Sequence, residues 1–178
     1  MNGGLQYLAP WESAPLVQLA CGGALLLYII GAIHILRDGG RIGIGPPIAY
    51  GVGVVLMYAV TQTHYDYLSQ YLFFAHRGQH LVLHHLAPFL IALAHPAPVL
   101  AAGLPARLRR ASGGWRWLWR PLTLIYRGLQ QPAVACLLFV GLIYFWLIPS
   151  IHFDAMLSSK LYWVMNWSMA LDGLLFWW

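Results

Sequence analysis

Histidines crowd into one short stretch of an otherwise apolar sequence. Four of the ten residues from position 76 to position 85 are histidines, and a long apolar run begins there. An imidazole without a partner is costly in hydrocarbon, so such a group needs a reason. On a regular helix His76, His80 and His84 lie one turn apart along one stripe, and His85 lies about 100° further round. Imidazole nitrogens arranged in this way can hold a metal ion, ligate a haem iron or relay protons.

Other polar residues are expected near the same membrane face. His64 and Asp66 come shortly before the histidine stretch, and His152 and Asp154 follow a later apolar run. Histidine nitrogen suits copper, zinc and iron, and a carboxylate can ligate the ion or fix the histidine tautomer. The alternative is that these imidazoles bond to neighbouring helices or line a small wet cavity. The sequence predicts a metal site among the following residues: His64, Asp66, His76, His80, His84, His85 and His152.

Three more ionisable residues stand alone in apolar runs. His34 lies near the end of the first run, where a simple hydrogen bond explains it best. His95 lies about 22 Å beyond His80 along a straight helix, so it can join the cluster only if the chain folds back. Asp172 lies within the last run, where a carboxylate is either functional or paired with an arginine.

The composition indicates a membrane protein. Of the 178 residues, 60% are hydrophobic and 8% are charged, whereas soluble domains carry about 25% charged residues. The first residues include no basic region and no evident cleavage site, so they do not resemble a signal peptide. Cys21 and Cys136 lie in apolar runs and form no CxxC pair, so neither a disulfide framework nor a thiolate metal site is expected.

Five apolar runs are candidates for membrane spans, because about 20 residues cross a bilayer as a helix. They cover approximately residues 16–36, 46–61, 79–104, 132–151 and 161–178. Pro88, Pro96 and Pro98 should kink or break the third run. We therefore expect an all-α polytopic transmembrane helical bundle of about five spans, forming one domain over residues 1–178. Since no polar tail follows Trp178, we also expect a chain that is cut short at its C-terminal end.

The arginines predict the orientation in the membrane. Six of them lie between residues 105 and 131, and Arg37 and Arg41 follow the first run. With five spans both loops fall on one side, which the positive-inside rule makes cytoplasmic. The N-terminus, the region before His80 and the loop around His152 then face the periplasm of a bacterium. The expected location is the bacterial inner membrane, with several passes.

Motifs from position 76 onward resemble those of a known family. In chain order they are His76-x-x-Gln79-His80 with Ala87-Pro88, then Trp146-x-x-Pro149, then a terminal G-L-L-F-W-W that begins at Gly173. The similarity, over about residues 76–178, is to the CtaG family of cytochrome c oxidase assembly factors. This resemblance implies a multispanning protein of the bacterial inner membrane that delivers copper to the oxidase and is not an enzyme. Some family members are longer, which agrees with a truncated C-terminus.

The chain departs from that family at three positions. The family often carries W-H-x-P where this chain has Leu147, and an H-x-x-x-H pair where it has Tyr162 and Asn166. A copper site would therefore need substitutes for three histidines. Candidate substitutes are His84, His85 and His152. Methionine sulfur suits Cu(I), and the available methionines are Met57, Met156, Met165 and Met169.

Three functions are compatible with the sequence. The resemblance favours an assembly factor that takes copper at the periplasmic face and passes it to an oxidase subunit. The second function is a haem-binding or structural subunit of a respiratory complex, with the histidine stretch facing His34 or His152. The third is a membrane metalloenzyme, because His80-x-x-x-His84-His85 looks like one box of the di-iron hydroxylases, although no second box follows.

The expected partners follow from these functions. They are a cytochrome c oxidase subunit and membrane lipid, with other copper chaperones and a second copy of the chain as further candidates. The tryptophans and arginines from Trp115 to Arg120 predict an interfacial anchor on anionic lipid. No nucleic-acid partner is expected, because the arginines are placed as topology signals.

Overall fold

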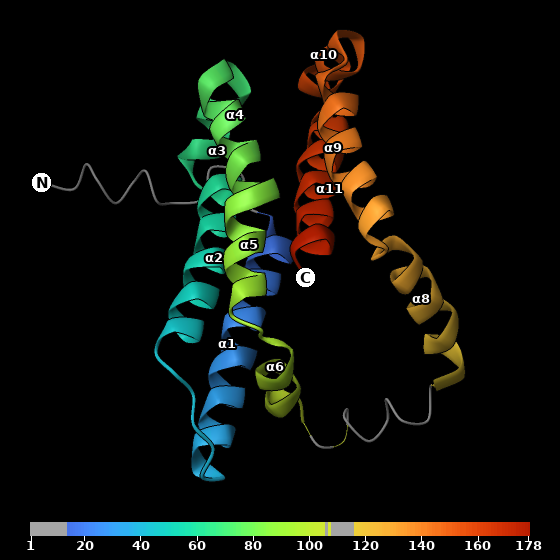
Figure 1. Ribbon diagram of the computed structural model, residues 1–178. Coiled ribbons are helices and arrows are strands. Elements are labelled where there is room, and N and C mark those ends of the chain that lie inside the picture. Colours follow the sequence, from blue (N-terminus) through green and yellow to red (C-terminus); the bar gives the residue numbers. More distant parts are fainter. Residues whose placement is uncertain (1–13, 106, 108–115) are drawn as a thin grey trace, which may run out of the picture.

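The computed structural model describes residues 14–105, 107 and 116–178, of which 116–120 by backbone alone. These ranges are almost wholly helical and contain no strand, as the sequence predicts. The helices form two groups that stand side by side (Figure 1), with α1 to α6 in one and α8 to α11 in the other. In the same view α3, α4 and α10 lie at one end of the bundle.

The first two predicted runs become α1 (Pro15–Arg37) and α2 (Gly45–Gln62). Both have proline in the first turn, where its missing N–H leaves no intrahelical bond unmade. Asp38 is the C-cap of α1, and Gly39 follows with a φ of 81°, a conformation that glycine adopts without a Cβ penalty. Thr63 separates α2 from the next helix and caps it, since its hydroxyl accepts from the Tyr65 amide at 3.2 Å.

The aromatic segment before the histidines forms two short helices, α3 (His64–Tyr71) and α4 (Phe73–Leu81). α4 continues through a π-helix, η2 (Val82–Leu86), into α5 (Ala87–Leu93). Pro88 gives a reason for the wider turn, because it has no amide for the carbonyl of His84 and its ring crowds that oxygen. The prediction that prolines break this run is confirmed after α5, where Pro96 precedes a new helix, α6 (Ala97–Gly103).

The number of membrane spans is less clear than the sequence suggests. Within the described ranges, α1 is the one helix that is long and apolar enough to cross a membrane by itself. Two helix pairs, each bent by 73°, bring the total to three if each pair is one span: Phe73–Leu93 with Ala97–Gly103, and Pro121–Leu129 with Pro132–Leu147. A membrane-spanning bundle is therefore supported, while five spans are not confirmed.

The basic segment after α6 was expected to be a loop, and this expectation is wrong for its second part. Residues Arg116–Leu129 form α8, with Pro121 inside the helix. Leu122, Leu124 and Ile125 are exposed apolar side chains on it. An amphipathic helix of this kind suits a membrane interface. Of the predicted lipid anchor, Trp115 and the side chains of residues 116–120 lie outside what the structure describes, as do Arg109 and Arg110.

The second group contains α9 (Pro132–Leu147), α10 (Pro149–Leu157) and α11 (Ser159–Trp177). α11 packs against α9, α10, α5 and the π-helix, so it connects the two groups. The crossing is closest at Gly173, where a Cβ would collide with the carbonyl oxygen of His84 and press against the ring of Pro88. Glycine is therefore required at this point for α11 to approach the histidine stretch.

Candidate functional site

Three histidine rings gather at the end of the bundle where α4 meets α10, and we call His76, His80 and His152 the outer cluster. The ring centroids of His76 and His80 are 4.4 Å apart, and those of His76 and His152 are 5.1 Å apart. His76 is 1% exposed and His80 is 7% exposed. The structure thus joins two neighbouring turns of α4 to a histidine that lies more than seventy positions later in the chain.

The ring nitrogens of the outer cluster have few partners. Both nitrogens of His76, Nε2 of His80 and Nδ1 of His152 are buried and form no hydrogen bond within the described part of the chain. Leaving such groups unpaired costs about 1–3 kcal/mol each, and buried polar atoms in native proteins nearly always have a partner. These four nitrogens are therefore the atoms of this region that are available to a ligand.

A hydrogen-bond network centred on Gln79 holds α4 in place next to the outer cluster. The Gln79 amide donates to the Val60 carbonyl and to Asp66 Oδ1, both at 2.7 Å. The Tyr162 hydroxyl lies 2.9 Å from Gln79 Oε1 and 3.1 Å from Asp66 Oδ1. Since these residues come from α2, α3, α4 and α11, the network fixes the two α4 histidines on either side of Gln79. Asp66 is placed as a supporting carboxylate, and direct ligation by it stays a prediction.

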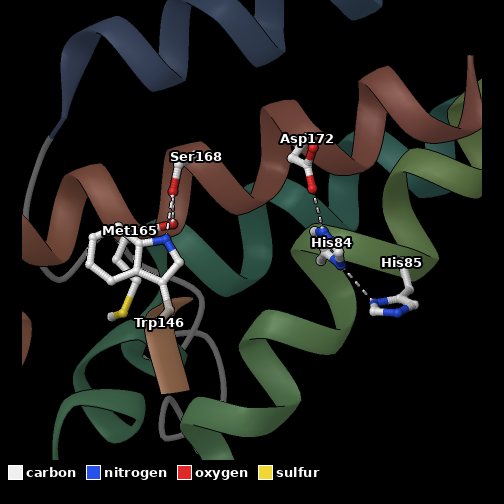
Figure 2. Close-up of polar contacts among 6 residues, drawn as sticks. All are labelled: His84, His85, Trp146, Met165, Ser168 and Asp172. Atoms are coloured by element: carbon white, nitrogen blue, oxygen red, sulfur yellow. Dashed lines mark hydrogen bonds and ion pairs between the residues drawn. The ribbon is translucent and has the colours of Figure 1, made fainter. Parts of the chain in front are cut away.

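The next two histidines belong to a different group. His84 Nε2 lies 3.0 Å from Asp172 Oδ2, and His84 Nδ1 lies 3.3 Å from His85 Nδ1 (Figure 2). We call Asp172, His84 and His85 the inner triad. The His84 side chain is 0% exposed, and its ring stacks on Phe139 of α9 with centroids 4.0 Å apart. His84 therefore turns toward α9 and α11, whereas the outer cluster gathers at α10.

Two expectations are corrected by the inner triad. The stripe of His76, His80 and His84 assumed a regular α-helix, but the π-helix at Val82–Leu86 changes the register between the second and third histidine. Asp172 was expected to be functional or paired with an arginine. Its partner is His84, so the pairing with an arginine is wrong, and a functional role stays a prediction. The predicted single site is therefore divided into two groups of histidines.

The remaining candidates lie elsewhere. His34 donates a hydrogen bond from Nδ1 to the Ala102 carbonyl at 2.9 Å, which confirms the simple role predicted for it. His95 bonds in the same way within its own turn. Asp154 is exposed on α10. His64 begins α3, two residues before Asp66, and its place in a metal site stays a prediction.

The outer cluster offers the kind of donor atom that borderline metal ions prefer, but its nitrogens are not placed around a common point. As they stand, no three side chains of His, Cys, Asp or Glu in the described ranges are arranged to share one ion. The ring of His76 is nevertheless in contact with the rings of His80 and His152, and copper and zinc bind the neutral form of the ring. Burial, together with the charge of Arg77, lowers the pKa of His152, which favours that neutral form.

A comparison with protein families decides the assignment. The cytochrome c oxidase caa3 assembly factor family (Caa3_CtaG) matches residues 26–178 of the chain. The chain belongs to this family. The resemblance expected from the motifs is thereby confirmed, and with it a role in cytochrome c oxidase assembly and an association with the oxidase. No match was found among curated proteins or among solved structures.

Two positions at which this caa3 assembly factor departs from the expected family motif lie beside the outer cluster. The Tyr162 ring is 6.2 Å from the ring of His76. Asn166 lies next to His80 and is 5% exposed, and its Oδ1 atom is buried without a hydrogen bond. His152 adds an imidazole to the same group. Leu147, the third departure, is 41% exposed at the end of α9.

Sequence reasoning missed several residues of this region. Gln79 was noted only as part of the H-x-x-Q-H motif, although its position between the two histidines was a signal for a supporting role. Phe139 was not considered, and an aromatic residue in an apolar run gives no such signal. The separation of His84 could have been found from Pro88, because a proline four residues after it removes the amide that its carbonyl needs.

Proposed function

We propose that this protein binds a copper ion at the outer cluster and passes it to a subunit of the oxidase. The observation that carries the proposal is the set of three touching imidazoles whose buried ring nitrogens have no partner. An assembly factor of a copper-containing oxidase has a use for such a site. Copper is here the cargo, so the site must release the ion as well as hold it.

The chemistry of the cluster suits a transient cargo. Imidazole nitrogen binds copper well, and three neutral imidazoles leave a coordination position open to an incoming ligand. We infer that the half-buried His152 ring rotates when the ion binds, so that its nitrogen turns toward the other two. Rotation of this kind makes the cluster a site that closes on the ion and opens again when the acceptor subunit supplies its own ligands.

A cavity lies beside the outer cluster, because Tyr162 and Asn166, which neighbour His76 and His80, are part of its lining. It has a volume of about 310 Å³, and its lining also includes Asp66 and Met156. The carboxylate attracts cations, and the thioether of Met156 is a soft donor that suits Cu(I). We infer that copper reaches the histidines through this cavity.

The side of the membrane follows from the arginines. The connection between α1 and α2, which holds Arg37 and Arg41, and helix α8 lie away from the end of the bundle that carries α4 and α10 (Figure 1). The positive-inside rule then assigns the outer cluster and the N-terminus to the periplasmic face of a bacterial inner membrane. A periplasmic site is accessible to copper chaperones and to the periplasmic part of an oxidase subunit.

The arrangement does not favour haem or a di-iron centre. His76 and His152 are in edge-to-face contact, so no macrocycle fits between these two rings. The histidines of the predicted box, His80, His84 and His85, are divided between the two groups described above. A purified protein without a Soret band and without bound iron would agree with the copper proposal.

Copper analysis tests the proposal directly. The protein purified in detergent is loaded with copper, desalted and analysed for metal, alongside a triple variant, His76→Ala/His80→Ala/His152→Ala. We expect the variant to lose about one equivalent of copper relative to the unchanged protein. The matched control is His34→Ala, because His34 already bonds a backbone carbonyl. A triple variant with full copper content would overturn the assignment.

A further inference from the structure

We infer that the inner triad is a second, separate station for a transition-metal ion. The ion would be held between Nδ1 of His84 and Nδ1 of His85, with Asp172 fixing the orientation of the first ring. The class of ion is soft to borderline, with Cu(I) as the simplest example. The inference stands on contacts that the outer cluster does not share.

The spacing of the two nitrogens carries the first step. His84 Nδ1 and His85 Nδ1 are 3.3 Å apart. An ion at about 2.0 Å from each nitrogen would form an N–metal–N angle of about 110°, which is close to tetrahedral. Adjacent residues on a regular helix point about 100° apart, so two neighbouring rings that converge on one point are not the usual outcome.

The carboxylate carries the second step. A neutral imidazole has one N–H, and in His84 it is directed from Nε2 to Asp172 Oδ2 at 3.0 Å. The lone pair of His84 Nδ1 therefore faces His85. Metal-ligating histidines commonly donate their other N–H to a carboxylate, which fixes the tautomer and increases the basicity of the ligating nitrogen. Asp172 is a positioning residue of this kind.

The surroundings carry the third step. His84 is fully buried and Asp172 is 10% exposed, so the arrangement is rigid on that side. Phe139 packs on both rings, with centroids 4.0 Å from His84 and 5.0 Å from His85. His85 is half-buried and leaves the site open on its own side. The π-helix that aims both rings is a feature found frequently at functional sites.

The two protein nitrogens leave the coordination of the ion incomplete. Within the described ranges no third His, Cys, Asp or Glu completes it. The remaining ligands must come from water or from the oxidase subunit that docks on the open side. Since His80 and His84 are four residues apart, or about 6 Å along the helix axis, one helix would present both stations in series.

Competitive titration with Cu(I) tests the inference. The full chain in detergent is titrated with Cu(I) under ascorbate in the presence of the chelator bicinchoninate. We expect two equivalents of Cu(I) for the unchanged protein and one for His85→Ala, a half-buried position that tolerates truncation. Asp172→Asn should retain both equivalents while weakening the second by about 10–100-fold, the usual effect of losing such a carboxylate. A purely structural hydrogen bond would not change copper affinity.

The outcomes separate this inference from the proposed function. If His85→Ala and Asp172→Asn both bind copper like the unchanged protein, the second station does not exist and His84 and His85 share only a hydrogen bond. If the outer triple variant keeps its copper while His85→Ala loses one equivalent, the outer site fails and the inner one stands. Size-exclusion profiles of the variants in detergent verify that each chain remains folded.

Discussion

The outer cluster and the inner triad are built from the same residue type on the same helical segment, yet they differ in how their nitrogens are satisfied. In the outer cluster four buried ring nitrogens have no hydrogen bond in the described ranges. In the inner triad His84 is bonded at both nitrogens. The difference shows that burial alone does not define a ligand site. What differs is whether the surrounding helices supply a partner for each buried nitrogen.

The cause of the difference is local. α4 is a regular helix, so His76 and His80 lie one turn apart and face α10, whose His152 adds a third imidazole. After Leu81 the helix widens, and His84 comes to face α11 at the level of Asp172. One widened turn thus separates the four histidines between positions 76 and 85 into two groups.

The largest effect on stability should come from removing the inner pair. His84→Leu leaves the nearly buried carboxylate of Asp172 without its partner, and we expect the free energy of unfolding to fall by about 2–3 kcal/mol. His80→Leu is the matched comparison and should cost much less, because its Nε2 atom already lacks a partner. Unfolding in detergent with increasing SDS, followed by circular dichroism, measures both. Equal losses would mean that the two groups do not differ as described.

A methyl group at the crossing of α5 and α11 should have the next largest effect. In Gly173→Ala the new Cβ meets the carbonyl of His84 and the ring of Pro88. We expect a loss of about 1–3 kcal/mol from overpacking, together with weaker binding at the inner triad. Gly22→Ala is the control, since a Cβ there meets nothing within 4 Å. A Gly173→Ala protein as stable as this control would argue against the close crossing.

Adding an imidazole to the outer cluster should strengthen copper binding there. Asn166→His places a ring next to His80, where the family commonly has a histidine. We expect copper at the outer cluster to bind about tenfold more tightly, as a fourth nitrogen completes the coordination. The affinity is measured by chelator competition, with Asn166→Ala as the control. No gain in affinity would indicate that Asn166 does not face the bound ion.

The smallest effect should be a shift in the pH dependence of copper binding. Burial is the main cause of the lowered pKa of His152, and the charge of Arg77 adds to it. In Arg77→Gln that pKa rises toward its ordinary value, so protons displace copper from the ring at a higher pH. Copper release from the outer cluster, followed from pH 8 down to pH 4, should therefore have its midpoint at a higher pH than in the unchanged protein. Arg37→Gln is the control. Because Arg37 lies at the end of α1 that is distant from the outer cluster, this variant should leave the midpoint unchanged.

Most of the helical fold could be predicted from the sequence. The apolar runs at 16–36, 46–61 and 161–178 agree with α1, α2 and α11 to within a few residues, because hydropathy and terminal prolines are local signals. α8 was missed, since its tryptophans and arginines were interpreted as a loop anchor. α3 and the first residues of α4 were missed as well, because mixed aromatic and polar residues show no clear helical period.

The site could be predicted in part. The pattern His76-x-x-Gln79-His80 gave two members of the outer cluster, and His152 was a candidate because of the expected topology. The contact between His84 and Asp172 depends on the register of a π-helix and on the approach of α11 at Gly173. Such long-range contacts leave no periodic signal, although Pro88 and Gly173 mark the place where they occur.

The close crossing at Gly173 has a mechanical consequence. Two helical rods that touch most tightly at one level can change their mutual angle about that level while the contact itself is kept. For α11 and the histidine helix this pivot lies beside Asp172, well below the ends that carry Tyr162 and His76. A change of that angle would move the end of α11 that carries Tyr162 relative to the end of α4 that carries His76, while the contact at Gly173 is kept.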